Sequence, residues 1–277
     1  MILEIFLLAL AGVLIGIYGS MIGAGGGLIA VPILLLVLRL EPDMAVGTSL
    51  FMTLFVAISA SIVFLKQGRV DRGLALRFSI FTIPGAIAGA FIVDNVELNI
   101  FRTLFGVLMV ASSIYLLVDR SKKGSGISKK GMLRVVTDSS GAVFEFRVRM
   151  VLGYLMSFLV GFTSSFFGIG GGIVMVPLMI GILGIPVQVA IATSQLMIVI
   201  TASGGTLTHF QLGNIAFETA LPLTIGGILG AQIGARAIRR AEGRSIRFLL
   251  SAGLAVLGGG LIIACVSINL ARKKFVI

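Results

Sequence analysis

The chain is poor in charge, and among its 277 residues it has no tryptophan and a single cysteine. Charged residues make up 12% of the sequence and hydrophobic residues 57%, and the mean hydropathy is +1.13. Such a composition excludes a soluble globular domain of this length. The lone Cys265 excludes an internal disulfide and a cysteine-based metal site. We therefore predict a multi-pass protein of the cell (inner) membrane with no cofactor and no metal.

Acidic residues are scarce as well, with 11 Asp and Glu against 22 Lys and Arg. The basic residues lie in short connections between apolar runs, which is the positive-inside pattern of membrane proteins rather than a nucleic-acid-binding face. The expected spans carry no aspartate or glutamate away from their ends. This argues against a buried carboxylate relay for protons or sodium. No cluster of nucleophile, base and acid stands out, so we do not expect an enzyme.

Glycine, in contrast, is abundant and forms two clusters. Gly23-Ala24-Gly25-Gly26-Gly27 recurs as Gly168-Ile169-Gly170-Gly171-Gly172, and a proline, Pro32 or Pro177, follows each cluster at the same distance. Consecutive glycines destabilise a helix, and backbone groups freed inside a membrane must face a cavity, a solute or other protein. Close helix packing is the alternative explanation. We predict that the two breaks face each other and form a solute site.

The second half of the chain repeats the first with an offset of 145. Thr48-Ser49 corresponds to Thr193-Ser194, and the small-residue pair Gly85 and Gly89, typical of helix packing, corresponds to Gly230 and Gly234. Basic residues mark opposite connections in the two halves, so equivalent loops are expected on opposite sides of the membrane. The connections concerned hold Lys66, Arg69, Arg72 and Arg77 in the first half and Arg236, Arg239, Arg240, Arg244 and Arg247 in the second.

We therefore expect an all-α, polytopic protein of two inverted-topology repeats. It would have about 8 full transmembrane helices plus 2 short or re-entrant segments, Leu28–Leu40 and Ile173–Ile185, which are too short for the hydrocarbon core. The expected domains are a first membrane repeat (1–118), a cytoplasmic basic linker with a candidate β-hairpin (119–149) and a second membrane repeat (150–277). Asp43 is placed to cap the helix that follows it.

Helix N-termini that begin near Gly27 and Gly172 would present unpaired N–H groups and positive dipole ends, which suit an anion. Hydroxyl and amide donors lie nearby in the sequence, although each of them could instead be a polar packing residue. The candidate substrate-binding residues are Ser20, Gly23, Gly25, Gly26, Gly27, Thr48, Ser49, Ser165, Gly168, Gly170, Gly171, Gly172, Thr193, Ser194 and Gln195.

Two motifs carry a resemblance to a known family. They are the glycine clusters ending in Val31-Pro32 and Val176-Pro177, followed by Val46-Gly47-Thr48-Ser49 and by Ile191-Ala192-Thr193-Ser194. These motifs resemble the TauE/SafE family of sulfite exporters, also called toluene sulfonate uptake permeases. The resemblance implies a multi-pass permease for sulfite, sulfonates or related anions, and it covers nearly the whole chain except the central linker.

We therefore predict a secondary transporter that moves a small sulfur-containing oxyanion or organosulfonate, such as sulfite, out of the cell by alternating access. The alternatives are an anion channel or a permease for another organic anion. The expected partners are the small anionic substrate and the lipid bilayer, with a homodimer as a further option and no nucleic acid.

Overall fold

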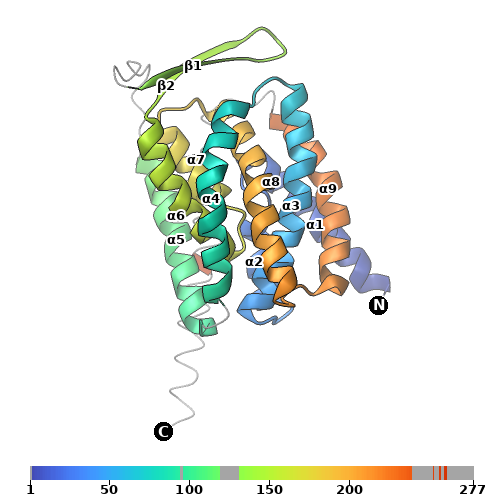
Figure 1. The fold of residues 1–277 in the computed structure, drawn as a ribbon. Helices are drawn as coiled ribbons and strands as arrows, with labels where there is room; N and C mark the ends of the chain where they lie inside the picture. The colour runs from blue at the N-terminus through green and yellow to red at the C-terminus, as the bar shows by residue number, and fades with distance from the viewer. Residues whose placement is uncertain are drawn as a thin grey trace.

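The computed structural model describes residues 2–93, 96–118 and 131–238, together with residues 252, 256, 259 and 260. Within these residues the chain forms an upright bundle of helices with a two-stranded sheet at one end, which we call the hairpin end (Figure 1). The cluster Arg239, Arg240, Arg244 and Arg247 lies outside the described residues, as does the expected last span apart from residues 252, 256, 259 and 260.

The helices follow the predicted order. They are α1 (Ile2–Ile22), α2 (Gly27–Leu36), α3 (Pro42–Lys66), α4 (Arg72–Val93), α5 (Leu98–Val118), α6 (Met150–Phe167), α7 (Gly172–Gly181), α8 (Val187–Gln211) and α9 (Phe217–Ala237). One detail is wrong: Asp43 does not cap α3. Glu41 occupies the cap position and Pro42 begins the helix, since the fixed φ of proline suits a first turn.

Five helices, α1, α3, α4, α6 and α8, are long and apolar enough to cross a membrane. The short helices α2 and α7 have 10 residues each. At 1.5 Å per residue each reaches about 15 Å, roughly half of a hydrocarbon core. The described part of the chain is thus a polytopic membrane protein with several spans and two half-length helices.

The central helices α3 and α8 run in opposite directions. The loop after α3 lies at the start of α8, because the Asp71 N–H donates to Thr193 Oγ1 at 3.0 Å. The loop after α8 lies at the start of α3, because the Ala216 N–H donates to Thr48 Oγ1 at 3.0 Å. The four residues are equivalent pairs under the offset of 145. The opposite course of the two helices is visible in Figure 1.

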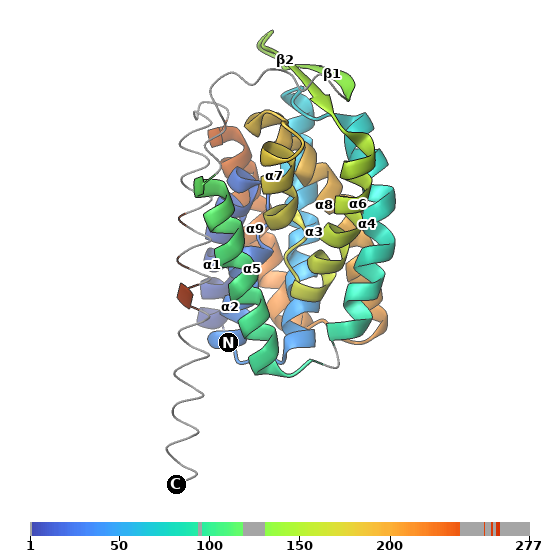
Figure 2. The ribbon, with the colours of Figure 1, turned by 90° about the vertical axis from the view of Figure 1, so that its left-hand side faces the viewer.

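Each half of the chain packs one of its helices against a helix of the other half. Helix α1 packs along α9 and α6 packs along α4, and glycines bring the backbones together. A Cβ atom on Gly230 would lie 2.9 Å from Ile17 N, and one on Gly89 would lie 2.9 Å from Phe166 N. The packing role predicted for the paired glycines is confirmed. Figure 2 shows the same bundle from the side, with α5 along its outer face.

The hairpin predicted in the central linker is present. Strands β1 (Met132–Thr137) and β2 (Val143–Val148) pair antiparallel, from Met132 opposite Val148 to Thr137 opposite Val143. The turn between them begins at Asp138, whose carboxylate accepts from the Ser140 and Ala142 N–H groups at 2.8 and 3.1 Å. An aspartate at this position favours a turn because it satisfies the backbone locally.

Candidate functional site

The two glycine clusters are sharp breaks between helices. The chain leaves α1 through Gly23, Gly25 and Gly26, whose φ angles are 77°, 73° and 109°, and enters α2 at Gly27. Gly168, Gly170 and Gly171, with φ of 71°, 70° and 83°, make the same turn between α6 and α7. Side-chain-bearing residues rarely adopt these angles. The glycines therefore serve the turns and not only close packing.

The breaks lie against each other at the centre of the bundle. A Cβ atom on Gly27 would collide with the carbonyl oxygen of Gly168 and lie 2.6 Å from Ile169 Cα. A Cβ atom on Gly172 would collide with the carbonyl oxygen of Gly23 and lie 2.6 Å from Ala24 Cα. The contact is the same in both directions, so the first residue of each half-length helix packs against the break of the opposite half.

Side chains from the long central helices hold each break from the opposite half. Ser49 Oγ donates to the Gly168 carbonyl at 2.7 Å, and its equivalent Ser194 donates to the Gly23 carbonyl at 3.0 Å. Gln195 Nε2 donates to the Gly19 carbonyl at 3.1 Å. Since these donors already have backbone partners, their role in this conformation is to fix the breaks.

The remaining polar candidates are buried too. Ser20 donates to the carbonyl of Ile17 in its own helix at 3.0 Å, whereas Ser165 Oγ is buried with no hydrogen bond to a described residue. Close to the breaks, Thr53 Oγ1, Ser164 Oγ and Gln195 Oε1 share this state. Ser164 lies beside Ser165 in the run of hydroxyl residues just before the second break, where the sequence indicates donors. Thr53 was not expected, because it lies in a helix away from both glycine clusters in the sequence.

Backbone donors are available at the same place. The first hydrogen bonds accepted by Gly26 and Gly171 come from the N–H groups of Ile29 and Val174, at 3.1 and 3.3 Å. The N–H groups of Gly27, Leu28, Gly172 and Ile173 donate to no other backbone group within the described ranges. Unpaired first-turn amides are normal at a helix N-terminus and attract negative charge.

No charge balances these donors in the described core. The buried carboxylates of the described residues are Asp71 and Asp138, and both pair with arginines at the hairpin end. The described centre therefore offers neutral N–H and O–H donors around two positive dipole ends, and such dipole ends attract negative charge.

A comparison with known families settles the class of protein. The family profile described as sulfite exporter TauE/SafE matches residues 8–261. The chain belongs to this family. Proteins described as probable membrane transporters in several organisms align with it over most of their length. The family is one of membrane transporters rather than enzymes.

Two relatives illustrate the range of sequence identity among the matches. "Probable membrane transporter protein YunE" of Bacillus subtilis is 31% identical over 263 residues, covering 92% of this chain and 96% of the relative. "Probable membrane transporter protein YfcA" of Escherichia coli K12 is 24% identical over 241 residues, covering 87% and 83%. No solved structure matches the chain.

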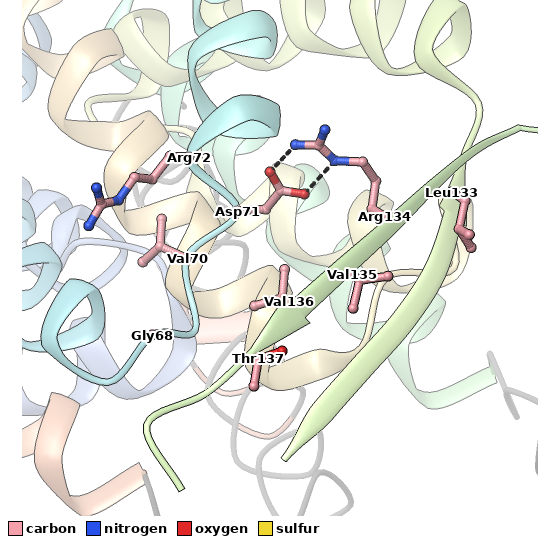
Figure 3. A pocket seen from close by; sticks show the side chains of 9 residues that line it. All are labelled: Gly68, Val70, Asp71, Arg72, Leu133, Arg134, Val135, Val136 and Thr137. Carbon is pink, nitrogen blue, oxygen red and sulfur yellow. Dashed lines mark hydrogen bonds and ion pairs between the residues drawn. The ribbon is translucent and has the colours of Figure 1, made fainter. Parts of the chain in front are cut away.

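A second arrangement of this TauE/SafE protein, which we call the hairpin clamp, joins the hairpin to the loop after α3. It consists of Arg69, Asp71, Arg134 and Asp138. Arg134 on β1 holds Asp71 with two hydrogen bonds, one of them from Nε at 2.8 Å, beside a surface cavity of about 440 Å³ (Figure 3). Arg69 Nη2 lies 3.1 Å from Asp138 Oδ2. The hairpin, predicted only as a connector, is thus fastened to the bundle.

The hairpin clamp is connected to the first glycine break through helix α8. The N–H of Asp71 donates to Thr193 Oγ1, and the next residue, Ser194, holds the Gly23 carbonyl. Two adjacent residues of α8 therefore connect the hairpin end to the first break by hydrogen bonds.

The hairpin clamp predicts an acid-sensitive contact. The Ser140 hydroxyl, the Ser140 and Ala142 N–H groups and Arg69 lower the pKa of Asp138 to about 2, against desolvation. A lowered pKa contributes stability that is complete above the unfolded value of about 3.9 and is lost as pH falls toward 2.

We expect the melting temperature of the purified protein to fall as the pH is lowered from about 3.9 to about 2. Asp138→Asn should flatten that dependence, whereas Glu145→Gln on the neighbouring strand should leave it unchanged, and equal pH profiles for all three proteins would contradict the assignment.

Proposed function

We propose that the protein is a secondary transporter that carries a small sulfur-containing oxyanion or organosulfonate, such as sulfite, out of the cell by alternating access. The main support is the close contact of the two breaks, from which α2 and α7 begin, at a centre where the described residues include no buried carboxylate. The sulfite exporter description of the matching family fits this substrate class.

In this proposal the anion is bound by backbone amides at the two breaks and by hydroxyl groups beside them. The amides of Gly27 and Gly172 begin the half-length helices. The hydroxyls of Ser164 and Ser165 are buried and lack other partners in the described part of the chain. Ser49 and Ser194 hold the breaks in place, so they act on the substrate through the backbone.

The proposal includes two inverted repeats, residues 1–118 and 150–277, separated by the linker 119–149. The opposite course of α3 and α8 and the equivalent hydrogen bonds at their ends support the inversion. Lys66, Arg69, Arg72 and Arg236 all lie at the hairpin end, which favours a cytoplasmic position for that end. Inverted repeats with broken helices at matching positions are typical of secondary transporters with a site at the repeat interface.

Counterflow tests the proposal against its main alternative. Proteoliposomes loaded with unlabelled sulfite should accumulate labelled sulfite above the external concentration, because a carrier exchanges substrate across the membrane. An anion channel would only equilibrate the label. If no sulfite, thiosulfate or sulfonate shows accumulation while another organic anion does, the mechanism stands and the substrate class is wrong.

Substitutions of two serines should distinguish residues that bind the substrate from residues that stabilise the glycine breaks. Ser165→Ala removes a hydroxyl without a described partner, so we expect the melting temperature to stay unchanged. Sulfite binding should become roughly 10- to 150-fold weaker, since a hydrogen bond to a charged group contributes about 1.5–3 kcal/mol. Ser194→Ala removes the bond to Gly23 and should lower stability by about 1–3 kcal/mol. Isothermal calorimetry and thermal unfolding measure the two effects. Full sulfite affinity in Ser165→Ala would remove this residue from the site.

A further inference from the structure

A large cavity opens at the hairpin end between α3 and α9, away from the glycine breaks. Its volume is about 1040 Å³, and the turn of the hairpin closes one side through Ser139. Cavities of several hundred cubic ångströms are large enough to hold a small-molecule group. Nothing in the transport proposal requires this space.

Two cations face this cavity from different halves of the protein. Lys66 ends α3 and Arg236 lies in the last turn of α9. Arg236 is held by its own helix, because Nη2 donates to Gln232 Oε1 at 3.0 Å. Among the described residues that line the cavity there is no aspartate or glutamate, so none of these residues neutralises either charge. An uncompensated pair of cations attracts an anionic group.

The cavity wall also contains the buried side chain of Gln67. Gln67 donates through Nε2 to the Ala235 carbonyl at 2.9 Å, which ties α3 to α9. Its Oε1 is buried without a hydrogen bond to any described residue. A buried amide oxygen without a partner is unfavourable. A bound group that carries both negative charge and a hydroxyl donor would satisfy the cations and this oxygen together.

The walls of the cavity point to the membrane as the source of that group. Ile62 on α3 is 49% exposed and Ile233 on α9 is 53% exposed, and both line the cavity. Apolar side chains next to basic ones at the end of membrane helices fit acyl chains below a charged headgroup.

The equivalent place at the other end of the bundle does not have this chemistry. Under the offset of 145, Lys66 corresponds to Gln211 and Arg236 to Phe91. The positive-inside pattern explains a surplus of basic residues at one end. It does not explain why two of them border one cavity with an unsatisfied amide oxygen between apolar walls.

We propose that this cavity binds the headgroup of an anionic phospholipid with hydroxyl groups, such as phosphatidylglycerol, from the leaflet at the hairpin end. Lys66 and Arg236 contact the phosphate, Gln67 Oε1 accepts from a headgroup hydroxyl, and the acyl chains follow Ile62 and Ile233. The lipid thereby joins the last turn of α3, in the first half, to the last turn of α9, in the second.

Native mass spectrometry of the full-length protein tests this proposal. Purified in detergent with added phosphatidylglycerol or phosphatidylcholine, the wild type should retain phosphatidylglycerol preferentially. Lys66→Gln with Arg236→Gln should weaken retention on the order of 25-fold, because each basic residue near a membrane surface contributes about fivefold. The charge-preserving pair Lys66→Arg and Arg236→Lys should keep it. Arg72→Gln with Arg77→Gln removes two exposed cations of the same end outside this cavity and is the matched control.

The other possible results of these measurements also bear on the lipid proposal. Equal retention in both glutamine pairs would overturn it, as would equal retention of the two lipids by the wild type. Stabilisation by inorganic phosphate or sulfite in place of phosphatidylglycerol, with the same loss in the Lys66 and Arg236 pair, would identify a site for a free anion instead. Loss of sulfite counterflow with unchanged lipid retention would concern only the transport proposal.

Discussion

Gly172→Ala should abolish sulfite counterflow and lower the melting temperature of the purified protein. The added methyl group would collide with the carbonyl oxygen of Gly23 and lie 2.6 Å from Ala24 Cα. Backbone atoms cannot rotate away as a flexible side chain would, so the two breaks must separate. Overpacking of this kind costs typically 1–3 kcal/mol and sometimes more. Because Gly172 does not have a positive φ, the effect reports the contact and not backbone strain.

Gly204→Ala is the matched control. This glycine lies in the helix α8, where the nearest atom to an added Cβ would be Ile83 Cγ2 at 3.9 Å. Alanine favours a helix more than glycine by roughly 1 kcal/mol, so this variant should be as stable as the wild type or more so. Counterflow and thermal unfolding compare the two. Normal flux in Gly172→Ala would mean that the breaks need not touch for transport.

Asp71→Asn should weaken the hairpin clamp. The carboxylate of Asp71 accepts from Arg134 and from the Leu74 N–H at 2.9 Å at the start of α4. Asparagine can still accept from Leu74, but Arg134 loses its counter-charge. Breaking a buried ion pair costs about 3–5 kcal/mol, and partial exposure of the Arg134 side chain reduces this to roughly 2–3 kcal/mol. We expect a lower melting temperature and faster amide hydrogen exchange in 132–148 and at the start of α8.

A double-mutant cycle checks the origin of that loss. If the ion pair is responsible, adding Arg134→Gln to Asp71→Asn should cause little further damage, because neighbouring partners are not additive. Additive losses would show that each residue acts alone. If amide hydrogen exchange in Asp71→Asn becomes faster only in the hairpin and not in α8, the proposed connection from Asp71 through Thr193 to the first break is wrong.

The helices and the breaks could be predicted from the sequence, because the apolar runs and the glycine clusters are patterns within short segments of the chain. They also predicted the hairpin, whose alternating residues surround Asp138. They did not predict that Ser49 and Ser194 hold breaks in the opposite half. These contacts join residues 119 and 171 positions apart, and no periodicity of a single segment encodes them.

The hairpin clamp was missed for a similar reason. Asp71 looks like an ordinary loop residue, and Arg134 like one of several basic residues in a linker. Only the fold brings β1 over the loop after α3. The Asp43 error is local: the proline at position 42 begins the helix earlier than the aspartate suggested.

The exchange of outer helices between the halves affects how the protein is made. Helix α1 leaves the ribosome long before α9, and the glycine face that receives α9 has no partner until then. The contact of α1 with α9 forms only after more than a hundred and fifty further residues have been synthesised. The packing of this face is therefore completed late in synthesis, when the final helices arrive.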